Sequence, residues 1–519
     1  KKEKIKEYLP ESLMEENQLV NLNDALQKIH FPQNLEEAQK AKQRLAFEEL
    51  FILQLSTLAR KKEWENKGKG QPFSIAKFNN SVQIFLDKLP FELTNAQKKA
   101  VKEISADLET EKPMNRLLEG EVGSGKTVVA AITMYLSFLN GYQSVLMAPT
   151  EILAQQHYET ITQLLKPFGV KIGLQTSSNK YQVLSTKNKK GKILNTKYQI
   201  LDTDILIGTH AVISEKVKFK NLALVVIDEQ QRFGVEQRAI IRSKGKNPHL
   251  LTMTATPIPR TVALTMYGDL ELSLLDEMPI GRKKVKTWLV PPVKRDRAYK
   301  WIAEEINKNK SQAFIICPFI EESESMVTVK AAAKEFENLK RIFPKLRLGL
   351  LHGKMKSKEK EEILNSFKNK KIDILVATPV VEVGIDIPNA TIIMIEASER
   401  FGLAQLHQLR GRVGRGDKQS YCLLFTDSKN DSTLKRLKSM EIIYIGEELA
   451  ELDLKLRGAG DLYGIMQHGR NMLKVADFSD FELIERTKRE AGKIFNEISK
   501  YPILLEKIKE INNKNISPD

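Results

Sequence analysis

Hydrophobic residues follow one spacing in the first part of the chain and another in the rest. In residues 34–58 they recur at steps of three and four, which is the period of an amphipathic helix. Residues 1 to about 85 are therefore expected to be helical. Within this stretch, residues 61–72 are polar, contain glycines and end in Pro72, which predicts a turn or linker.

After Pro90, short apolar runs alternate with longer stretches of helical period. Each run is continuously apolar, as in strands that are buried on both faces. Strands of this kind between helices predict a parallel sheet with helices on both sides. The runs of this first series are residues 144–148, 204–208, 222–227 and 251–254.

A second series of the same kind follows, so a second α/β domain of similar build is expected. Its runs are residues 313–319, 346–352, 373–378, 390–396 and 420–425. The boundary is expected near the polar segment 278–286, and the chain after about Asp427 is charged and mainly helical. The predicted domains are 1–85 (a helical linker), 86–285, 286–425 and 426–519 (helical).

Composition excludes several classes of protein. The chain has 519 residues, of which 41% are hydrophobic and 29% charged, which is ordinary for a globular protein and excludes wholesale disorder. No run of about 18 apolar residues occurs, so a membrane span is not expected. The two cysteines, Cys317 and Cys422, each lie in an apolar run and cannot form a disulfide scaffold or a zinc cluster. Both are expected to be reduced core residues of a cytoplasmic protein.

The formal net charge is +16, the difference between 82 Lys and Arg residues and 66 Asp and Glu residues. Such a charge suits a polyanionic partner. A lysine-rich surface without a specific role would give the same number, so charge alone leaves both interpretations open.

Residues 120–127 read GEVGSGKT and fit the phosphate-binding loop pattern G-x-x-x-x-G-K-[ST]. The glycines let backbone N–H groups turn toward phosphate oxygens, and the N-terminus of the following helix adds partial positive charge. Lys126 is expected to contact the β- and γ-phosphates, and Thr127 to ligate Mg²⁺. The expected ATP contacts in this loop are Gly120, Glu121, Val122, Gly123, Ser124, Gly125, Lys126 and Thr127.

Two further groups complete a predicted ATP-hydrolysing site. Asp228 and Glu229 directly follow an apolar run, so Asp228 is expected to hold Mg²⁺ through water and Glu229 to polarise the attacking water. Phosphoryl transfer also needs positive charge from outside the phosphate loop's own domain. Arg412 and Arg415 in QLHQLRGRVGR are three apart, so a helix would point both to one side. One ATP shared between two such domains predicts a motor whose halves are drawn together by nucleotide.

These motifs resemble the superfamily 2 helicases, and among them the RecG family of ATP-dependent DNA helicases, over nearly the whole chain. The resemblance implies an α/β fold with two tandem RecA-like motor domains, a helical N-terminal linker and a helical C-terminal translocation module. FELTNAQ at residues 91–97 resembles the adenine-reading Q motif. Phe91 and Gln97 are therefore expected at the nucleotide, with Gln97 pairing with the adenine edge. Gln408, in QLHQLRGRVGR, is also expected to bind ATP.

Other motifs of the family imply contacts with DNA or coupling between DNA and ATP. They are APTEILAQQH, GTHA, TATPIPRT, LHGKM and ATPVVEVGIDIPNA. ELAELDLKLRGAGDLYGIMQHGR at residues 448–470 resembles a translocation motif whose helical hairpin feeds a loop that pushes duplex DNA; an ordinary helical cap is the alternative. The residues expected to contact DNA or to couple are Thr150, Thr209, His210, Thr254, Thr256, Arg260, His352, Thr378, Arg457 and Gln467.

The motifs at residues 397–415 and 448–470 are typical both of RecG and of the transcription-repair coupling translocase. Residues 29–55 favour RecG, because they resemble the segment that joins its wedge domain to its motor; the wedge itself would lie before the first residue. Two positions depart from the family's pattern. Gln231 stands where His is usual and cannot titrate, and Pro379 stands where Thr is expected and lacks a backbone donor.

The resemblance implies an enzyme that uses ATP and Mg²⁺ to move on duplex DNA and to remodel stalled forks and Holliday junctions in recombination and repair. It also implies a cytoplasmic monomer, with single-strand binding protein as a further candidate partner and no membrane contact. Two alternatives stay open. One is a related motor at stalled transcription complexes, and the other is a nucleotide-gated DNA-binding scaffold with weak turnover, which the departures at Gln231 and Pro379 would suit.

Overall fold

The computed structural model divides the chain into two compact units. The smaller unit consists of Lys1–Gly68, Ile258–Leu272 and Leu454–Asp519, and the larger of Lys69–Pro257 and Ser273–Asp453. The described residues are 5–66, 68–177, 182–183, 199–200, 202–257, 259, 262–263, 265, 268, 270–279, 282–318, 325–379, 387–457 and 473–516, without the side chains of 65, 182–183, 199–200, 231, 235, 325–333, 357, 457 and 512–516. The domain boundaries expected from the sequence remain a proposal.

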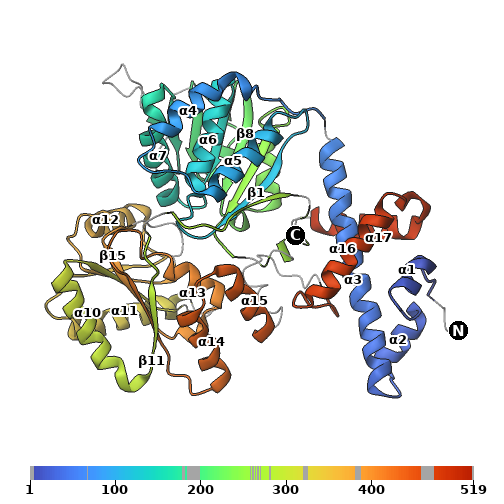
Figure 1. Cartoon of the computed structure of the whole chain (residues 1–519). Coiled ribbons are helices and arrows are strands. Elements are labelled where there is room, and N and C mark those ends of the chain that lie inside the picture. The colour runs from blue at the N-terminus through green and yellow to red at the C-terminus, as the bar shows by residue number, and fades with distance from the viewer. Residues whose placement is uncertain are drawn as a thin grey trace. The chain divides into compact units, whose positions relative to one another are not determined.

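The first series of apolar runs forms one sheet, with strand order β10-β1-β9-β8-β2-β6-β3-β4 (Figure 1). The pairs from β1 to β3 are parallel, and β4 is an antiparallel edge strand. The strands are β1 (Asn115–Gly120), β2 (Gln143–Met147), β3 (Ile172–Gln175), β4 (Gln182–Val183), β6 (Ile205–Gly208), β8 (Leu222–Asp228), β9 (His249–Thr254) and β10 (Glu271–Leu275); β5 (Gln199–Ile200) and β7 (Val217–Lys218) pair separately.

Helices pack against this sheet, and α6 contacts both α5 and α7 (Figure 1). Leu224 and Val226 of β8 belong to the core beneath these helices, and the intervening Val225 is also fully buried. Both faces of the strand are therefore covered, as its continuous apolar sequence predicts. The helices are α4 (Asn79–Asp87), α5 (Asn95–Leu108), α6 (Lys126–Leu139), α7 (Glu151–Leu165) and α8 (Val235–Ser243).

The second series forms a separate parallel sheet with order β11-β16-β15-β12-β14-β13. Side chains of β12 alternate between two cores, with Phe314 and Ile316 in one and Ala313 and Ile315 in the other. The strands are β11 (Lys286–Val290), β12 (Gln312–Ile316), β13 (Leu348–Leu351), β14 (Ile374–Ala377), β15 (Ala390–Ile395) and β16 (Tyr421–Phe425). The helices are α10 (Arg295–Asn309), α11 (Ser325–Ile342), α12 (Ser357–Lys368), α13 (Leu403–Arg410), α14 (Asp431–Ile442) and α15 (Gly446–Arg457).

The two sheets repeat one topology. The order β1-β9-β8-β2-β6-β3 corresponds neighbour by neighbour to β11-β16-β15-β12-β14-β13. The turn after β8 has Glu229 at φ 52°, and the turn after β15 has Ala397 at φ 45°. Each of these left-handed residues is followed by a short 3₁₀ helix and by the sequence Arg-Phe-Gly. The prediction of two tandem RecA-like domains is confirmed by this repeat.

The smaller unit is helical and is centred on one long helix, α3 (Leu35–Asn66). Helices α2 (Leu22–His30), α16 (Phe481–Phe495) and α17 (Pro502–Ile516) contact α3, and α1 (Glu11–Glu16) precedes them. The expected turn at residues 61–72 is wrong in its first part, because α3 continues to Asn66. Lysine and glutamate favour helix, so a polar sequence without glycine or proline does not end one.

Both cysteines are buried and unpaired, as expected. Burial raises the pKa of Cys317 and that of Cys422 to about 12, so both thiols stay protonated at neutral pH. In the part of the chain that the structure describes, no helix is long and apolar enough to span a bilayer.

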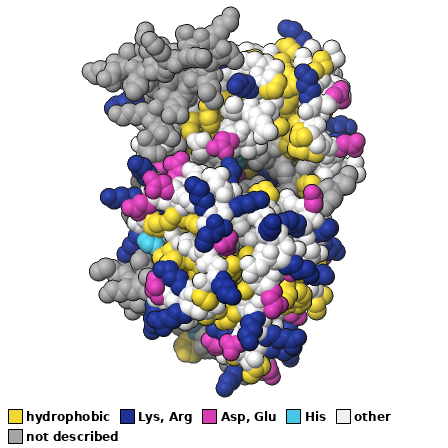
Figure 2. Space-filling view, turned by 90° about the vertical axis from the view of Figure 1, so that its left-hand side faces the viewer, with side chains coloured by type: hydrophobic (Ala, Val, Ile, Leu, Met, Phe, Trp, Pro, Cys, Tyr) yellow, Lys and Arg dark blue, Asp and Glu magenta, His cyan; other side chains and the backbone are white. Residues whose placement is uncertain are grey.

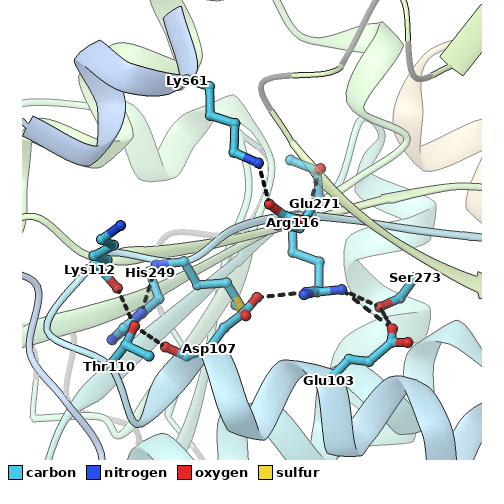
Figure 3. A network of polar contacts seen from close by, with 11 residues as sticks. Lys61, Glu103, Asp107, Thr110, Lys112, Arg116, His249, Glu271 and Ser273 are labelled. Carbon is cyan, nitrogen blue, oxygen red and sulfur yellow. Dashed lines mark hydrogen bonds and ion pairs between the residues drawn. The ribbon is translucent and has the colours of Figure 1, made fainter. Parts of the chain in front are cut away.

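A polar network joins α5 to the first sheet at the end of β1 opposite the phosphate loop (Figure 3). Arg116 is 7% exposed, and its Nε donates to Asp107 Oδ2 at 2.7 Å. Its Nη1 donates to Ser273 Oγ at 2.8 Å and lies 3.4 Å from Glu103. These contacts pair a buried guanidinium with two carboxylates, which avoids the cost of an isolated buried charge.

His249 is locked as a neutral imidazole beside this network. The ring is fully buried; its Nδ1 accepts from Met114 N at 3.0 Å, and its Nε2 lies 2.8 Å from the Gln71 carbonyl. A carbonyl only accepts, so Nε2 carries the proton and Nδ1 has none. Burial lowers the pKa of His249, and a second ring proton would in addition end the bond from Met114 N.

We predict that His249 makes unfolding depend on pH. Below about pH 6.5, the unfolded histidine takes up a proton that the folded ring resists. Its contribution to the free energy of unfolding is complete above that pH and is lost as pH falls toward the lowered pKa, by up to about 1.4 kcal/mol per pH unit. Urea unfolding above and below about pH 6.5 measures this, and His249→Gln should reduce the dependence whereas the exposed His30→Gln should not. An unchanged dependence in His249→Gln would contradict the assignment.

Candidate nucleotide site

The phosphate loop lies where β1 passes into α6, as its sequence predicts. β1 ends at Gly120 and α6 begins at Lys126. Gly123 and Gly125 have φ values of 83° and 89°, a left-handed backbone that favours glycine. Residues 128–137 of α6 are buried. The helix is therefore fixed in the core, and its N-terminus and the loop before it are held at the edge of the sheet.

Lys126 lies within the electrostatic field of four predicted site residues. Its Nζ donates to the carbonyls of Gly120 at 2.6 Å and Glu121 at 3.0 Å. Burial lowers the pKa of Lys126, and the charges of Glu229 and Asp228 oppose that change.

The charges of Arg412 and Arg415 act on the same amino group and lower its pKa further. Both arginines belong to the second sheet's domain. The side chains that the sequence assigned to opposite halves of one site are thus close enough to Lys126 to affect its ionisation.

Asp228 is the last residue of β8 and is 7% exposed. Its Oδ2 lies 2.8 Å from His157 Nε2, and its Oδ1 accepts from Glu229 N at 3.1 Å. Burial alone would raise the pKa of Asp228, but the hydrogen bond with His157 and the charge of Lys126 outweigh it, and the pKa is lowered. The carboxylate is therefore ionised at neutral pH and is held at both oxygens.

His157 is a site residue that the sequence did not reveal. It lies on α7, is 7% exposed, and belongs to the same helix as the predicted DNA contact Thr150, which caps the helix N-terminus. A histidine within a helical, partly apolar stretch gives no signal of its own. The contact with Asp228 depends on α7 packing against β3 and β6 of the sheet that contains β8, which only the fold provides.

Glu229 and Gln408 contact the segment after β9 from opposite sides. Glu229 Oε2 accepts from Ala255 N at 3.5 Å, which is at the limit of a hydrogen bond. Gln408 Nε2, from α13 in the second domain, donates to Thr256 Oγ1 at 2.8 Å. Thr254 Oγ1 in turn accepts from Thr256 N at 3.1 Å. Three predicted residues, Gln408, Thr254 and Thr256, are therefore linked directly.

The two arginines do not lie on a helix, so that expectation is wrong. α13 ends at Arg410, and Arg412 and Arg415 follow in an irregular loop. Gly411 ends the helix, and Gly414 has a φ of 78°, which breaks helical spacing. The side chain of Arg412 is buried, with 3% of the residue exposed. We call residues 411–415 the arginine loop.

Arg410, the third arginine of the motif, has a different set of contacts. Its Nη1 donates to the carbonyls of Met440 and Ile443 at 2.9 and 3.0 Å. Its Nη2 lies 2.8 Å from His407 Nδ1. Since arginine only donates, His407 accepts at Nδ1 and carries its proton on Nε2.

The proton on His407 Nε2 faces the phosphate loop. Nε2 lies 3.3 Å from Glu121 Oε1, which also accepts from Gly446 N at 2.8 Å. Burial alone would raise the pKa of Glu121, but the bond with His407 outweighs it and the pKa is lowered. One loop carboxylate thus joins α13 to the first residue of α15.

A cavity of about 690 Å³ lies on this side of the phosphate loop. Glu121, His407 and Arg410 line it together with Glu447 of α15. Lys126 and Asp228 are not among its lining residues. Ala255 and Thr256, which bond to Glu229 and Gln408, do line it, so the cavity adjoins the segment after β9.

The Q-motif residues lie as follows. Gln97 is 2% exposed, and its Oε1 accepts from Thr94 N at 2.9 Å in a capping box at the start of α5. Its Nε2 donates to Ser124 O at 2.8 Å. Both ends of the amide therefore bond within the chain and hold the phosphate loop, and pairing with adenine would require these bonds to be exchanged. Phe91 is 48% exposed, which suits a stacking surface.

Of the seven expected DNA-contact residues whose side chains are described, four are buried. Thr209, Thr254, Thr256 and Thr378 are at most 5% exposed. His210 is exposed, and Thr150 and His352 are half-buried. Burial and neighbouring lysines lower the pKa of His352.

Some of the singled-out residues lie outside the described part of the chain. They are Arg260, Gln467 and the side chains of Arg457 and Gln231. Pro379 is described and is buried directly after Thr378. The DNA-contact roles therefore remain predictions.

Comparison with known proteins gives a consistent result. Residues 94–265 match the DEAD/DEAH box helicase family, and residues 297–417 match the helicase conserved C-terminal domain. The chain is 44% identical to the ATP-dependent DNA helicase RecG of Thermotoga maritima, with 94% of the chain and 62% of that protein covered. It is 45% identical to the ATP-dependent DNA helicase RecG of Bacillus subtilis, with 94% of the chain and 70% of that protein covered.

A solved structure of RecG bound to a three-way DNA junction also matches, with a TM-score of 0.75 and 41% identity. The match covers 94% of this chain and 62% of that one. The chain thus spans less than two thirds of the length of the Thermotoga relative and of the solved structure.

We predict that His157 is needed for tight Mg²⁺-dependent nucleotide binding. His157→Leu removes the donor that holds Asp228 Oδ2, and loss of such a supporting hydrogen bond typically weakens a metal site by about 10- to 100-fold. His157→Gln places an amide N–H near the original Nε2 and should restore most of the affinity. Titration with a fluorescent, non-hydrolysable ATP analogue, with Mg²⁺ and with EDTA, measures the effect. Equal Mg²⁺ dependence in the wild type and His157→Leu would contradict the role.

Proposed function

Because the chain belongs to the RecG family of helicases, we propose that it is an ATP-dependent translocase on double-stranded DNA that remodels branched DNA. One observation carries the proposal. The amino group of Lys126 lies in the field of two carboxylates from its own domain and of two arginines from the other. A single nucleotide at Lys126 would therefore contact both domains. The solved RecG structure with a three-way junction supports branched DNA as the substrate.

The phosphate loop binds the nucleotide's phosphates. Lys126 donates to two backbone carbonyls, and phosphate oxygens with full negative charge compete favourably for the same amino group. Two cationic arginines on the opposite side add attraction. Bound phosphates would also raise the lowered pKa of Lys126, so nucleotide binding and lysine ionisation support each other.

The donors at the start of α6 and at the end of β8 fit Mg²⁺. The hydroxyl of Thr127 and the ionised carboxylate of Asp228 are hard oxygen ligands. Mg²⁺ held there would neutralise part of the charge on the β- and γ-phosphates. His157 keeps the Asp228 carboxylate in one orientation.

Glu229 orients the attacking water. Its left-handed backbone, at φ 52° and ψ 59°, turns the chain sharply after β8, so that Asp228 and Glu229 need not alternate as they would in a strand. Arg412 and Arg415 stabilise the charge that develops on the transferred phosphoryl group. The arginines can act only while the two domains stay close, because they come from the second domain and the phosphate loop from the first.

Hydrolysis reaches the rest of the molecule through the contacts between the domains. Gln408 bonds Thr256, in the segment that also meets Glu229. A change in the distance between the domains must stretch or release this bond. The position of the segment 254–256 therefore depends on whether nucleotide holds the two domains together.

Duplex DNA is the proposed polyanionic partner. Figure 2 shows one face of the molecule on which Lys and Arg side chains are spread widely, with Asp and Glu between them. A spread of this kind suits contacts with phosphates along a duplex rather than recognition of bases. It agrees with the net charge of +16.

We expect Lys126→Ala to abolish ATP hydrolysis while leaving DNA affinity unchanged, because the amino group is proposed to contact the phosphates of ATP and not those of DNA. ATPase rates with single-stranded, duplex and forked DNA, together with a DNA-binding titration, measure both effects. Lys98→Ala, an exposed lysine on α5, is the matched control. Hydrolysis retained by Lys126→Ala would refute the site. A wild type that branched DNA does not stimulate would favour the nucleotide-gated scaffold.

We expect duplex affinity to fall steeply with salt and to be indifferent to base sequence. Each phosphate neutralised on B-DNA contributes a slope of about −0.9 to the plot of log affinity against log salt concentration. Fluorescence anisotropy with two duplexes of equal length and unrelated sequence, across a range of KCl concentrations, measures the slope. A flat salt response, or affinities that differ between the duplexes, would contradict binding through phosphates.

A further inference from the structure

Arg282 bonds to both halves of the nucleotide site, although it belongs to neither motif. It lies in the segment between β10 and β11 that connects the two sheets. Its Nη1 donates to Val122 O at 2.7 Å. Its Nε donates to Gly414 O at 3.0 Å, and its Nη2 to Gly411 O at 3.4 Å.

The three carbonyls belong to the two loops that carry the predicted catalytic groups. Val122 lies in the phosphate loop, four residues before Lys126. Gly411 and Gly414 directly precede Arg412 and Arg415. One side chain thus connects the loop that holds phosphate to both arginine positions of the arginine loop.

The two loops come close enough for this only because glycines line the contact. A Cβ on Gly123 would collide with Arg282 Nη1. A Cβ on Gly411 would lie 2.9 Å from Val122 Cβ, closer than real contacts allow. The contact therefore leaves no room for a side chain at Gly123 or Gly411, and Arg282 meets both loops at their backbone carbonyls.

Arginine is suited to this position in a way that lysine is not. A guanidinium presents its N–H donors in a rigid, planar fork, so three fixed carbonyls can be bonded at once. A lysine ammonium would keep the charge but would act as a single point at the end of a flexible stem. The position of the arginine loop therefore depends on the shape of the fork as well as on its charge.

We propose that Arg282 is a positioning residue that sets the spacing between the phosphate loop and the arginine loop, and so places Arg412 and Arg415 for hydrolysis. The inference rests on the proposed function. Because Arg282 lies on the covalent connection between the domains, the same segment joins the sheets and fixes the distance across the site. Ground-state nucleotide is held mainly by the phosphate loop, so loss of Arg282 should act on the transition state.

Two substitutions test the inference. Arg282→Lys keeps the charge and loses the fork, and Arg282→Met loses both; the exposed neighbour Lys283→Ala is the control. We expect both Arg282 variants to lower kcat for DNA-stimulated ATP hydrolysis by about 10- to 100-fold with KM for ATP nearly unchanged, the range seen for residues that support catalytic groups. Affinity for ADP with aluminium fluoride, which resembles the transition state, should fall by a similar factor, and affinity for ADP alone should not.

The alternatives give different results. Equal losses of affinity for ADP and for ADP with aluminium fluoride would mean that Arg282 merely shapes the phosphate loop, and would overturn the inference. Wild-type kinetics in Arg282→Lys would overturn the requirement for the fork. If Arg282→Met does not fold, as thermal melting would reveal, Arg282→Lys decides. A wild type without ATP hydrolysis would instead overturn the proposed function, and the two failures are therefore distinguishable.

Discussion

The structure depends on one electrostatic constraint, the half-buried ammonium of Lys126 at the edge of the first sheet. Removing an ammonium from water is costly even when it donates to two carbonyls, and this desolvation lowers the pKa of Lys126. Asp228 and Glu229 compensate part of that cost, whereas Arg412 and Arg415 increase it. The site therefore has a surplus of positive charge near Lys126, which a polyphosphate would relieve. This surplus of positive charge would attract nucleotide. Bound nucleotide would in turn reduce the repulsion between Lys126 and the arginines of the second domain.

The second domain shows what the first gains from this arrangement. Arg295 is the first residue of α10, as Lys126 is of α6, and Glu396 directly follows β15 where Asp228 ends β8. There Arg295 Nη2 lies 3.2 Å from Glu396 Oε2 and Tyr299 OH donates to Glu396 Oε1, so the two charges satisfy each other. Ala397 takes the left-handed position that Glu229 occupies in the first domain. The second domain therefore has the same topology as the first, but a closed ion pair stands where the first has Lys126 and Asp228. Ala397 cannot polarise water as Glu229 is proposed to do.

Local sequence predicted the helices, strands and the phosphate loop well, and the contacts between them less well. The phosphate loop and the strand before Asp228 were predictable, because glycine spacing and continuous apolar runs act over few residues. The approach of Arg412 to Lys126 was foreseen from chemical need, but its helical placement was wrong, since Gly411 ends α13. His157 and Arg282 were missed because their partners lie 71 and 160 residues away in sequence. Contacts of that range are set by sheet order, which no local pattern contains.

The phosphate loop faces two ways, and this connects the site to the last part of the larger unit. The charges of the predicted catalytic groups act on Lys126, while Glu121 accepts from Gly446 N and lies against His407. Arg410 fixes the same turn by holding the carbonyls that precede α15. Glu121 therefore joins the phosphate loop directly to the start of α15 and to α13. The link from the phosphate loop to α15 is thus one side chain long and needs no extended pathway through the core.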